Sequence, residues 1–174
     1  GRSDLAYRLI QNTTYPSWGY SIEQGATTIW ERWNSYTKKD GFGDVGMNSF
    51  NHYAYGSCSE WMFSSMLGID TDGPGFKKIL MKPEVGKGVS WARGHYDCIY
   101  GRVESGWERE GKEFKWDITV PANTTATVYV PGEDVRESGR SLDNVDEVEY
   151  LRIEKGRIVL AVESGNYQFK STLN

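Results

Sequence analysis

Residues 114–120 have the sequence Phe-Lys-Trp-Asp-Ile-Thr-Val, a strict alternation of apolar and polar side chains. Successive side chains of a β-strand point to opposite faces of a sheet, so this stretch predicts a strand with one buried and one solvated face. Turn-forming pairs, Glu110-Gly111 and Lys155-Gly156, lie between runs of the same kind. The other predicted strands include residues 76–82, Trp91 and its neighbours, 103–107, 126–130, 158–162 and 167–169. Together they predict an antiparallel β-sandwich.

The first part of the chain has helical periodicity instead. Apolar residues at positions 5, 6, 9 and 10 follow Ser3 and Asp4, which favour a helix start. Residues 17–24 predict a short helix that stops at Gly25. A chain that begins almost directly with an amphipathic helix lacks partners for the apolar face, so we expect further chain upstream of Gly1.

The clearest helix is predicted to start near Ser49 and to end at Gly68, which can adopt a left-handed cap conformation. Apolar residues off its main stripe predict contacts on a second side and deep burial. The turn-forming run 71–75 then predicts a boundary between a helical part, residues 1–70, and a β-sandwich, residues 71–174. The main stripe consists of Phe50, Tyr53, Ala54, Ser57, Cys58, Trp61, Met62 and Met66.

Charge and composition exclude several classes of function. The net charge is −4, with 20 basic and 24 acidic residues intermixed, so no basic stripe predicts nucleic-acid binding. No run approaches the roughly 20 apolar residues that a membrane-spanning helix needs. Cys58 and Cys98 have neither the density of a disulfide scaffold nor a metal-ligand spacing, and we expect no metal or cofactor. The cellular compartment stays open.

The densest chemical cluster lies in the long segment 26–48, which is too apolar for disorder and therefore indicates function. Here Glu31 is flanked by Trp30, Trp33 and Arg32. Aromatic faces stack on sugar rings, and a carboxylate kept ionised by Arg32 is suited to activate water, so the cluster suits sugar hydrolysis. The alternative is a buried Glu31–Arg32 ion pair packed between the two indoles.

Four other polar residues are weaker candidates. His52, expected in the first turn of the helix from Ser49, would donate to a sugar hydroxyl or simply satisfy helix-end groups. Glu23 is a rival carboxylate that a surface helix position explains adequately. His95 and Asp97 are expected on a loop between strands, in a structural role.

Several strings together resemble the bacterial α-L-rhamnosidases of glycoside hydrolase family 78. The resemblance covers essentially the whole chain, less firmly after about residue 132. The strings in the helical part are Pro16-Ser17-Trp18-Gly19-Tyr20, Gly25-Ala26-Thr27-Thr28-Ile29-Trp30-Glu31-Arg32-Trp33 and Ser49-Phe50-Asn51-His52-Tyr53-Ala54. Those in the sandwich are Pro74-Gly75-Phe76-Lys77-Lys78-Ile79, Tyr100-Gly101-Arg102-Val103-Glu104-Ser105 and Val120-Pro121-Ala122-Asn123-Thr124-Thr125-Ala126.

The resemblance implies the last helices of an (α/α)6 catalytic barrel followed by a C-terminal β-sandwich, and hydrolysis of terminal α-L-rhamnose with inversion. It assigns the general base to Glu31 and a rhamnose contact to His52, with Trp30 and Trp33 as candidate stacking residues. The family's general acid belongs to segments expected upstream of Gly1, and an inverting hydrolase needs both groups. We therefore expect the isolated chain to be inactive. We also expect it to expose apolar surface that the rest of the barrel or a second copy would cover.

Two other functions remain open. The sandwich is also consistent with a non-catalytic carbohydrate-binding or packing module. A barrel of this kind can also serve a glycosidase for a different sugar, because one fold hosts several substrate classes.

Overall fold

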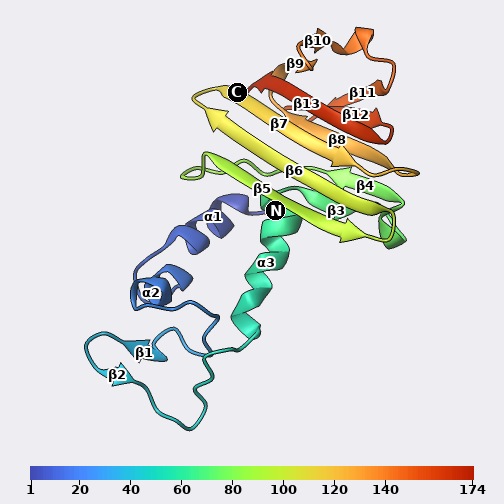
Figure 1. Ribbon diagram of the computed structural model, residues 1–174. Helices are drawn as coiled ribbons and strands as arrows, with labels where there is room; N and C mark the ends of the chain where they lie inside the picture. Colours follow the sequence, from blue (N-terminus) through green and yellow to red (C-terminus); the bar gives the residue numbers. More distant parts are fainter. The chain divides into compact units, whose positions relative to one another are not determined.

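The computed structural model describes all 174 residues and divides into two compact units (Figure 1). The first unit comprises residues 1–61 with 86–88, and the second comprises residues 62–85 with 89–174. Helices and one small hairpin make up the first, and two sheets dominate the second. No helix is both long enough and apolar enough to cross a membrane.

The two predicted short helices of the first unit are confirmed. Helix α1 spans Ser3–Gln11 and α2 spans Trp18–Glu23. The Ser17 hydroxyl accepts a hydrogen bond from the Tyr20 backbone N–H at 3.0 Å and so caps the start of α2. Gly25, with φ of 107°, adopts a conformation that favours glycine and follows the helix end.

The apolar face predicted for α1 is largely uncovered within this chain. Its buried residue is Tyr7, which is 2% exposed, whereas Leu5 and Leu9 are exposed. The Tyr7 ring meets Trp61 edge-on, with 5.1 Å between centroids. A Cβ atom on Gly86 would lie 2.1 Å from the Tyr7 ring, so only glycine permits this close packing.

The helix predicted from Ser49 starts later than expected. It begins with a 3-10 turn at Ala54–Ser57, continues as α3 over Cys58–Trp61, and ends in a π-helical turn at Met62–Met66. Residues 49–52 are not helical because they hydrogen-bond to residues 28–31 instead. Deep burial is also wrong, since no residue of these helical turns is buried in this chain. Gly68, with φ of 73°, follows the helix as predicted.

The segment between α2 and α3 contains the hairpin strands β1, Tyr36–Thr37, and β2, Gly41–Phe42. The remaining strands belong to the second unit. They are β3 Ile69–Thr71, β4 Lys78–Met81, β5 Trp91–Cys98, β6 Gly101–Glu110, β7 Glu113–Val120, β8 Thr125–Pro131, β9 Glu133–Glu137, β10 Arg140–Ser141, β11 Val148–Glu154, β12 Arg157–Val162 and β13 Gly165–Thr172. Short 3-10 turns occupy Pro74–Phe76 and Leu142–Asn144.

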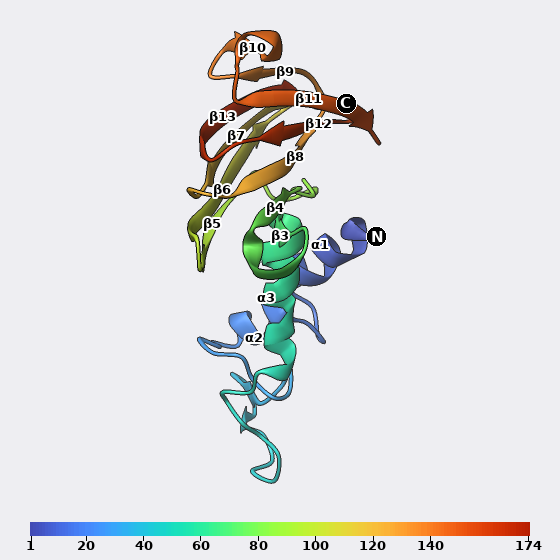
Figure 2. The ribbon, with the colours of Figure 1, turned by 90° about the vertical axis from the view of Figure 1, so that its right-hand side faces the viewer.

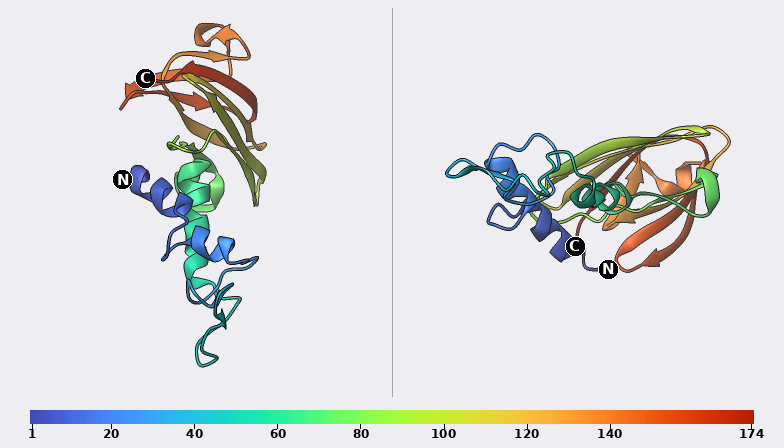
Figure 3. Two further views of the ribbon diagram at one scale, coloured as in Figure 1. Left: turned by 90° about the vertical axis from the view of Figure 1, so that its left-hand side faces the viewer. Right: turned by 90° about the horizontal axis from the view of Figure 1, so that it is seen from below.

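The second unit is a sandwich of two sheets (Figure 2). The six-stranded sheet has the order β10-β9-β13-β7-β6-β5, and every pair in it is antiparallel. The five-stranded sheet has the order β11-β12-β8-β4-β3. Its pair β4–β8 is parallel, which corrects the prediction of a wholly antiparallel sandwich. Figure 3 shows both layers from other directions.

The core lies between the two sheets, as the alternation predicted. On β7 the residues Phe114, Trp116, Ile118 and Val120 are at most 2% exposed. They belong to one cluster with the inward residues of β8 and β12. Full burial of such large side chains, each worth about 1.5–3 kcal/mol, is the main source of stability in this unit.

A chain of hydrogen bonds crosses this core. Trp116 Nε1 donates to Ser105 Oγ at 2.9 Å, and Ser105 Oγ donates to the Leu67 carbonyl at 2.6 Å. Trp107 Nε1 donates to the Met66 carbonyl at 2.7 Å. These bonds satisfy both indole N–H groups, which would otherwise be costly to bury.

His95 and Asp97 lie within β5, so their predicted loop position is wrong. Asp97 pairs with Arg102 of β6, with 2.8 Å between Nε and Oδ1. The Arg102 guanidinium lowers the pKa of the Asp97 carboxyl below its usual value. The pair closes the end of the β5–β6 hairpin, which fits the structural role expected for Asp97.

Candidate functional site

Glu31 and His52 lie on two segments of the first unit that hydrogen-bond to each other. The Glu31 N–H donates to the Ser49 carbonyl at 2.9 Å, and the His52 N–H donates to the Ile29 carbonyl at 2.8 Å. The Thr28 hydroxyl also donates to the Phe50 carbonyl. The structure therefore brings together the backbones of two predicted site residues that are 21 positions apart in sequence.

The Glu31 carboxylate is held by a backbone donor. Its Oε2 accepts a hydrogen bond from the Ser49 N–H at 2.7 Å, a length typical of a charge-assisted bond. Glu31 is half-buried, and its Oε1 accepts no hydrogen bond from the chain. One carboxylate oxygen is thus fixed, and the other is available to a water molecule or a ligand.

Arg32 does not pair with Glu31. Its side chain is exposed, and no ion pair joins the two residues, so the alternative of a buried Glu31–Arg32 ion pair is wrong. The contact by which Arg32 was expected to keep Glu31 ionised is not present either. Along this irregular segment Trp30 is buried and Trp33 half-buried, whereas the Arg32 between Glu31 and Trp33 is exposed to solvent.

Trp30 and Trp33 anchor the segment on both sides of Glu31. Trp30 is 7% exposed and meets Phe50 edge-on, with 5.4 Å between centroids. Trp33 stacks on Tyr55 at 3.9 Å and meets Trp18 edge-on at 5.1 Å. These contacts account for both indoles as packing residues, and their role in sugar stacking stays a prediction.

Hydrogen bonds of Ser35 connect the turn after Glu31 to the segment before Ser49. It is fully buried, and its hydroxyl both accepts from the Arg32 N–H at 3.2 Å and donates to the Arg32 carbonyl at 3.0 Å. The Ser35 carbonyl accepts from the Gly43 N–H at 2.8 Å and from Asn48 Nδ2 at 3.1 Å. Because Asn48 precedes Ser49, this network supports the donor that holds Glu31.

His52 lies just ahead of the helix rather than in its first turn. The Ala54 N–H donates to His52 Nδ1 at 3.3 Å, so the imidazole satisfies a helix-end group, as one of the two interpretations predicted. This bond uses the lone pair of Nδ1, which places the proton of the neutral ring on Nε2. Nε2–H can then donate to a ligand hydroxyl.

Other residues of the first unit add little chemistry. Glu23 ends α2 on the surface and its side chain makes no hydrogen bond, consistent with a surface helix position. A recess of about 60 Å³ lies among Trp18, Ile22, Ile29, Trp30, Trp33 and Tyr55. It is apolar and too small for a sugar ring, so this recess beside the two indoles is not a sugar pocket.

Sequence reasoning missed the residues that position Glu31. The donor from Ser49 is a backbone N–H, which has no side-chain signature, and Ser35 is one of many serines in the chain. The only available signal was the clustering of small polar residues at 48–51, within a stretch that also carried helical spacing.

Two family models match consecutive parts of the chain. The model of the bacterial alpha-L-rhamnosidase 6 hairpin glycosidase domain matches residues 1–66, and that of the bacterial alpha-L-rhamnosidase C-terminal domain matches residues 68–143. A two-sheet unit preceded by a helical unit, whose irregular segment carries a half-buried glutamate among tryptophans, therefore corresponds to a segment of a glycosidase. The chain belongs to the bacterial α-L-rhamnosidase family.

Individual relatives agree with this assignment. An alpha-L-rhamnosidase of Formosa agariphila is 40% identical over 174 residues, covering 98% of this chain and 19% of that protein. The crystal structure of a Streptomyces avermitilis alpha-L-rhamnosidase complexed with L-rhamnose is 38% identical with a TM-score of 0.87, covering 98% of this chain and 16% of that one. The structure of the Dictyoglumus thermophilum enzyme is 33% identical with a TM-score of 0.84, covering 100% of this chain and 19% of that one. The chain thus spans less than a fifth of the length of these relatives.

Proposed function

We propose that the protein containing this chain is an inverting α-L-rhamnosidase in which Glu31 is the general base. The observation that carries the proposal is the Glu31 carboxylate, which the Ser49 N–H holds by Oε2 while Oε1 stays free. An inverting hydrolase needs a carboxylate that takes a proton from water as the water attacks the anomeric carbon. A carboxylate held by one oxygen, with the other oxygen open, meets the geometric part of that requirement.

In the proposed reaction, Glu31 Oε1 accepts a proton from water on the face of the sugar opposite the leaving group. A carboxylic acid elsewhere in the protein protonates the departing glycosidic oxygen. His52 Nε2–H donates to a hydroxyl of the bound rhamnose, while Trp30 and Trp33 keep the Glu31 segment in place and line its surroundings. The match to a relative complexed with L-rhamnose supports rhamnose as the sugar.

We further propose that residues 1–66 form the last helices of the catalytic barrel. The match of these residues to the six-hairpin glycosidase domain supports this assignment. The first unit also exposes large apolar side chains, as a part of a larger helical layer would: Phe42 is 75% exposed, Val45 94%, Met47 73% and Tyr53 88%. Other barrel segments would cover this surface.

The test uses the whole protein with an aryl α-L-rhamnoside and the variant Glu31→Gln. General base catalysis contributes about 10²–10⁴-fold, so kcat should fall by that factor, with little change in substrate binding. Glu23→Gln is the matched control, because the Glu23 side chain is exposed and makes no hydrogen bond. It should retain wild-type activity.

Two further readouts separate the alternatives. NMR of the first product should show the inverted anomer for the wild type. A panel of other aryl glycosides tests the sugar, and faster hydrolysis of a different sugar would overturn the rhamnosidase assignment. Near-normal turnover of Glu31→Gln would return Glu31 to a structural role.

A further inference from the structure

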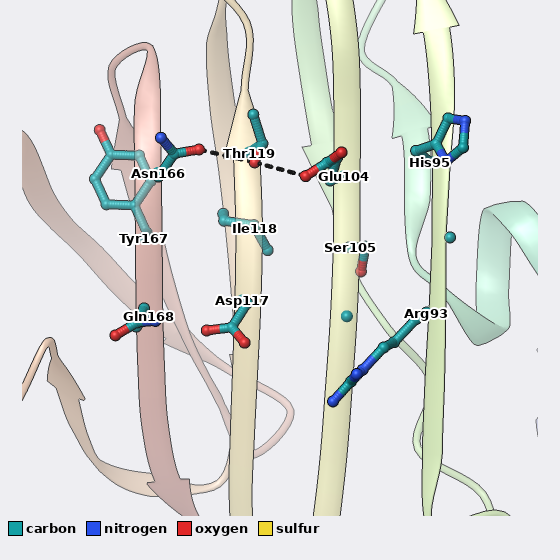
Figure 4. Close-up of a pocket in the computed structure, with 12 residues that line it drawn as sticks. Arg93, His95, Glu104, Ser105, Asp117, Ile118, Thr119, Asn166, Tyr167 and Gln168 are labelled. Carbon is teal, nitrogen blue, oxygen red and sulfur yellow. Dashed lines mark hydrogen bonds between the residues drawn. The ribbon is translucent and has the colours of Figure 1, made fainter.

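The outward face of the six-stranded sheet carries ordered rows of polar side chains. Strand register aligns them across β5, β6, β7 and β13. Because alternate residues of each strand point into the core, the others form this face. One row is His95, Glu104, Thr119 and Asn166, and the next is Arg93, Gly106, Asp117 and Gln168 (Figure 4).

A recess of about 620 Å³ lies over these two rows. Gly106 contributes no side chain at its centre, and a Cβ atom there would approach Arg93 Cγ to 3.3 Å. In Figure 4 the Arg93 side chain extends from β5 toward β6, while Asp117 and Gln168 lie on the other side of the recess. The missing side chain at Gly106 therefore gives the recess its depth, and its volume is in the range of small-ligand sites.

The recess contains polar groups whose hydrogen-bonding capacity is unused. The side chains of Asp117 and Gln168 make no hydrogen bond within the chain, and Arg93 makes only a 3.9 Å ion pair with Glu108. The neighbouring row is connected, since the Thr119 hydroxyl lies 2.8 Å from Asn166 Oδ1 and 3.2 Å from a Glu104 oxygen. Fixed and free groups of both donor and acceptor type thus face the same space.

The balance of charge selects the ligand. The Arg93 guanidinium opposes the carboxylates of Glu104 and Asp117 in one recess. The imidazole of His95 and the amides of Asn166 and Gln168 add further donor and acceptor groups. Two carboxylates would repel a phosphate or a polyanion, and the row offers no apolar patch for a protein partner. An uncharged ligand with many hydroxyl groups matches this mixture, since hydroxyls both donate and accept.

An exposed tryptophan completes the site. Trp91 is 61% exposed and is the only exposed residue of the seven tryptophans. It lies two positions before Arg93 on the same face of β5, about 7 Å along the strand. A second recess of about 200 Å³ lies against Trp91, Glu108 and Lys115. A sugar ring can stack on such an indole while the adjoining ring binds in the larger recess.

We propose that this face binds a neutral oligosaccharide, with Trp91 as the stacking platform and Arg93, Asp117 and Gln168 as hydroxyl ligands. The site uses only residues of the second unit and goes beyond the proposed catalytic function. It is a non-catalytic site that retains glycan near the enzyme. Loss of Glu31 function would leave it intact.

The test measures binding to the 174-residue chain by NMR of its indole N–H signals and by calorimetry. The probes are rutinose, which is α-L-rhamnosyl-(1→6)-glucose, and the tetraoses of cellulose, xylan and mannan, with an oligogalacturonate as the acidic comparison. At least one neutral probe should bind with a Kd of about 1 mM or tighter and shift the Trp91 signal. Trp91→Ala and Gly106→Val, which fills the recess, should each weaken binding at least tenfold.

Two control variants locate the effect. Tyr150→Ala removes an exposed aromatic residue from β11 of the other sheet and should bind like the wild type. Glu31→Gln should also bind normally, which separates this site from the catalytic one. Absence of binding by all neutral probes up to about 10 mM would overturn the proposal, as would binding of the oligogalacturonate alone or a Trp91→Ala variant with unchanged affinity.

Discussion

The substitution Ser105→Ala should destabilise the second unit more than its small change in volume suggests. Ser105 is 2% exposed and its hydroxyl is the middle link between two buried groups, the Trp116 indole N–H and the Leu67 carbonyl. Alanine keeps the packing but leaves both groups unpaired. Each unpaired buried group costs about 1–3 kcal/mol, so we expect a loss of about 3 kcal/mol in the free energy of unfolding.

Ser171→Ala is the matched control for this experiment. Ser171 is 3% exposed, but its hydroxyl makes one bond, to the Pro131 carbonyl at 2.6 Å. Its replacement leaves one acceptor with fewer hydrogen bonds and no unpaired donor, so we expect a loss of about 1 kcal/mol. The difference between the two variants isolates the cost of leaving the Trp116 N–H unpaired.

Urea unfolding of the chain, followed by the NMR signal of the Trp116 indole, reports on the second unit alone. This choice matters because two compact units need not unfold together. Linear extrapolation gives the free energy of unfolding, and an unchanged m-value shows that the exposed area is the same. Equal losses in Ser105→Ala and Ser171→Ala, or a loss below about 0.5 kcal/mol in the former, would refute the bridging role of the hydroxyl.

Two further predictions follow from individual contacts. In the whole protein, Ser49→Pro removes the N–H that holds Glu31 and should lower kcat about ten- to hundredfold, the equivalent of one charge-assisted hydrogen bond. Ser49→Ala keeps this N–H and should retain a kcat near the wild-type value. Comparable activity in both variants would contradict the positioning role of the Ser49 N–H. Burial opposes ionisation of Glu137, but hydrogen bonds from Ser138 and Arg140 outweigh it and keep the pKa of this carboxyl below its usual value. Arg140→Ala should therefore reduce stability at neutral pH, and the difference from wild type should vanish as the pH falls through the lowered pKa of Glu137; a difference independent of pH in thermal unfolding scans would contradict this.

The strands with the strongest alternation could be predicted from sequence, and the weakest could not. On β7 one face is fully buried, so the period of two is complete. Strand β9 was missed because four of its five residues are charged. Strand β11 was missed because it is an edge strand whose apolar residues Tyr150 and Ile153 are exposed, so it lacks a clear alternation. The parallel pairing of β4 with β8 was also missed, since alternation determines which face is buried but not the direction of the neighbouring strand.

The start of the helix predicted from Ser49 could not be predicted correctly, for a different reason. Residues from Ser49 onward have a helical stripe, yet their backbone groups bond to residues 28–31. A local pattern cannot reveal a competing partner 18 or more positions away, and here the tertiary hydrogen bonds override the local preference. The same bonds place Glu31 next to Ser49, so the failure of the helix prediction and the geometry of the site have one cause.

The same hydrogen bonds give the two tryptophans beside Glu31, the proposed base, a positioning role. Trp30 and Trp33 fix the backbone from two sides through Phe50 and Tyr55, residues that follow Ser49 in the partner segment. The indoles therefore hold together the two segments whose hydrogen bond orients the carboxylate. Replacing either ring would act on Glu31 through Ser49 rather than through any contact of its own. In this arrangement the aromatic residues fix the position of the proposed base, whether or not they also touch the sugar.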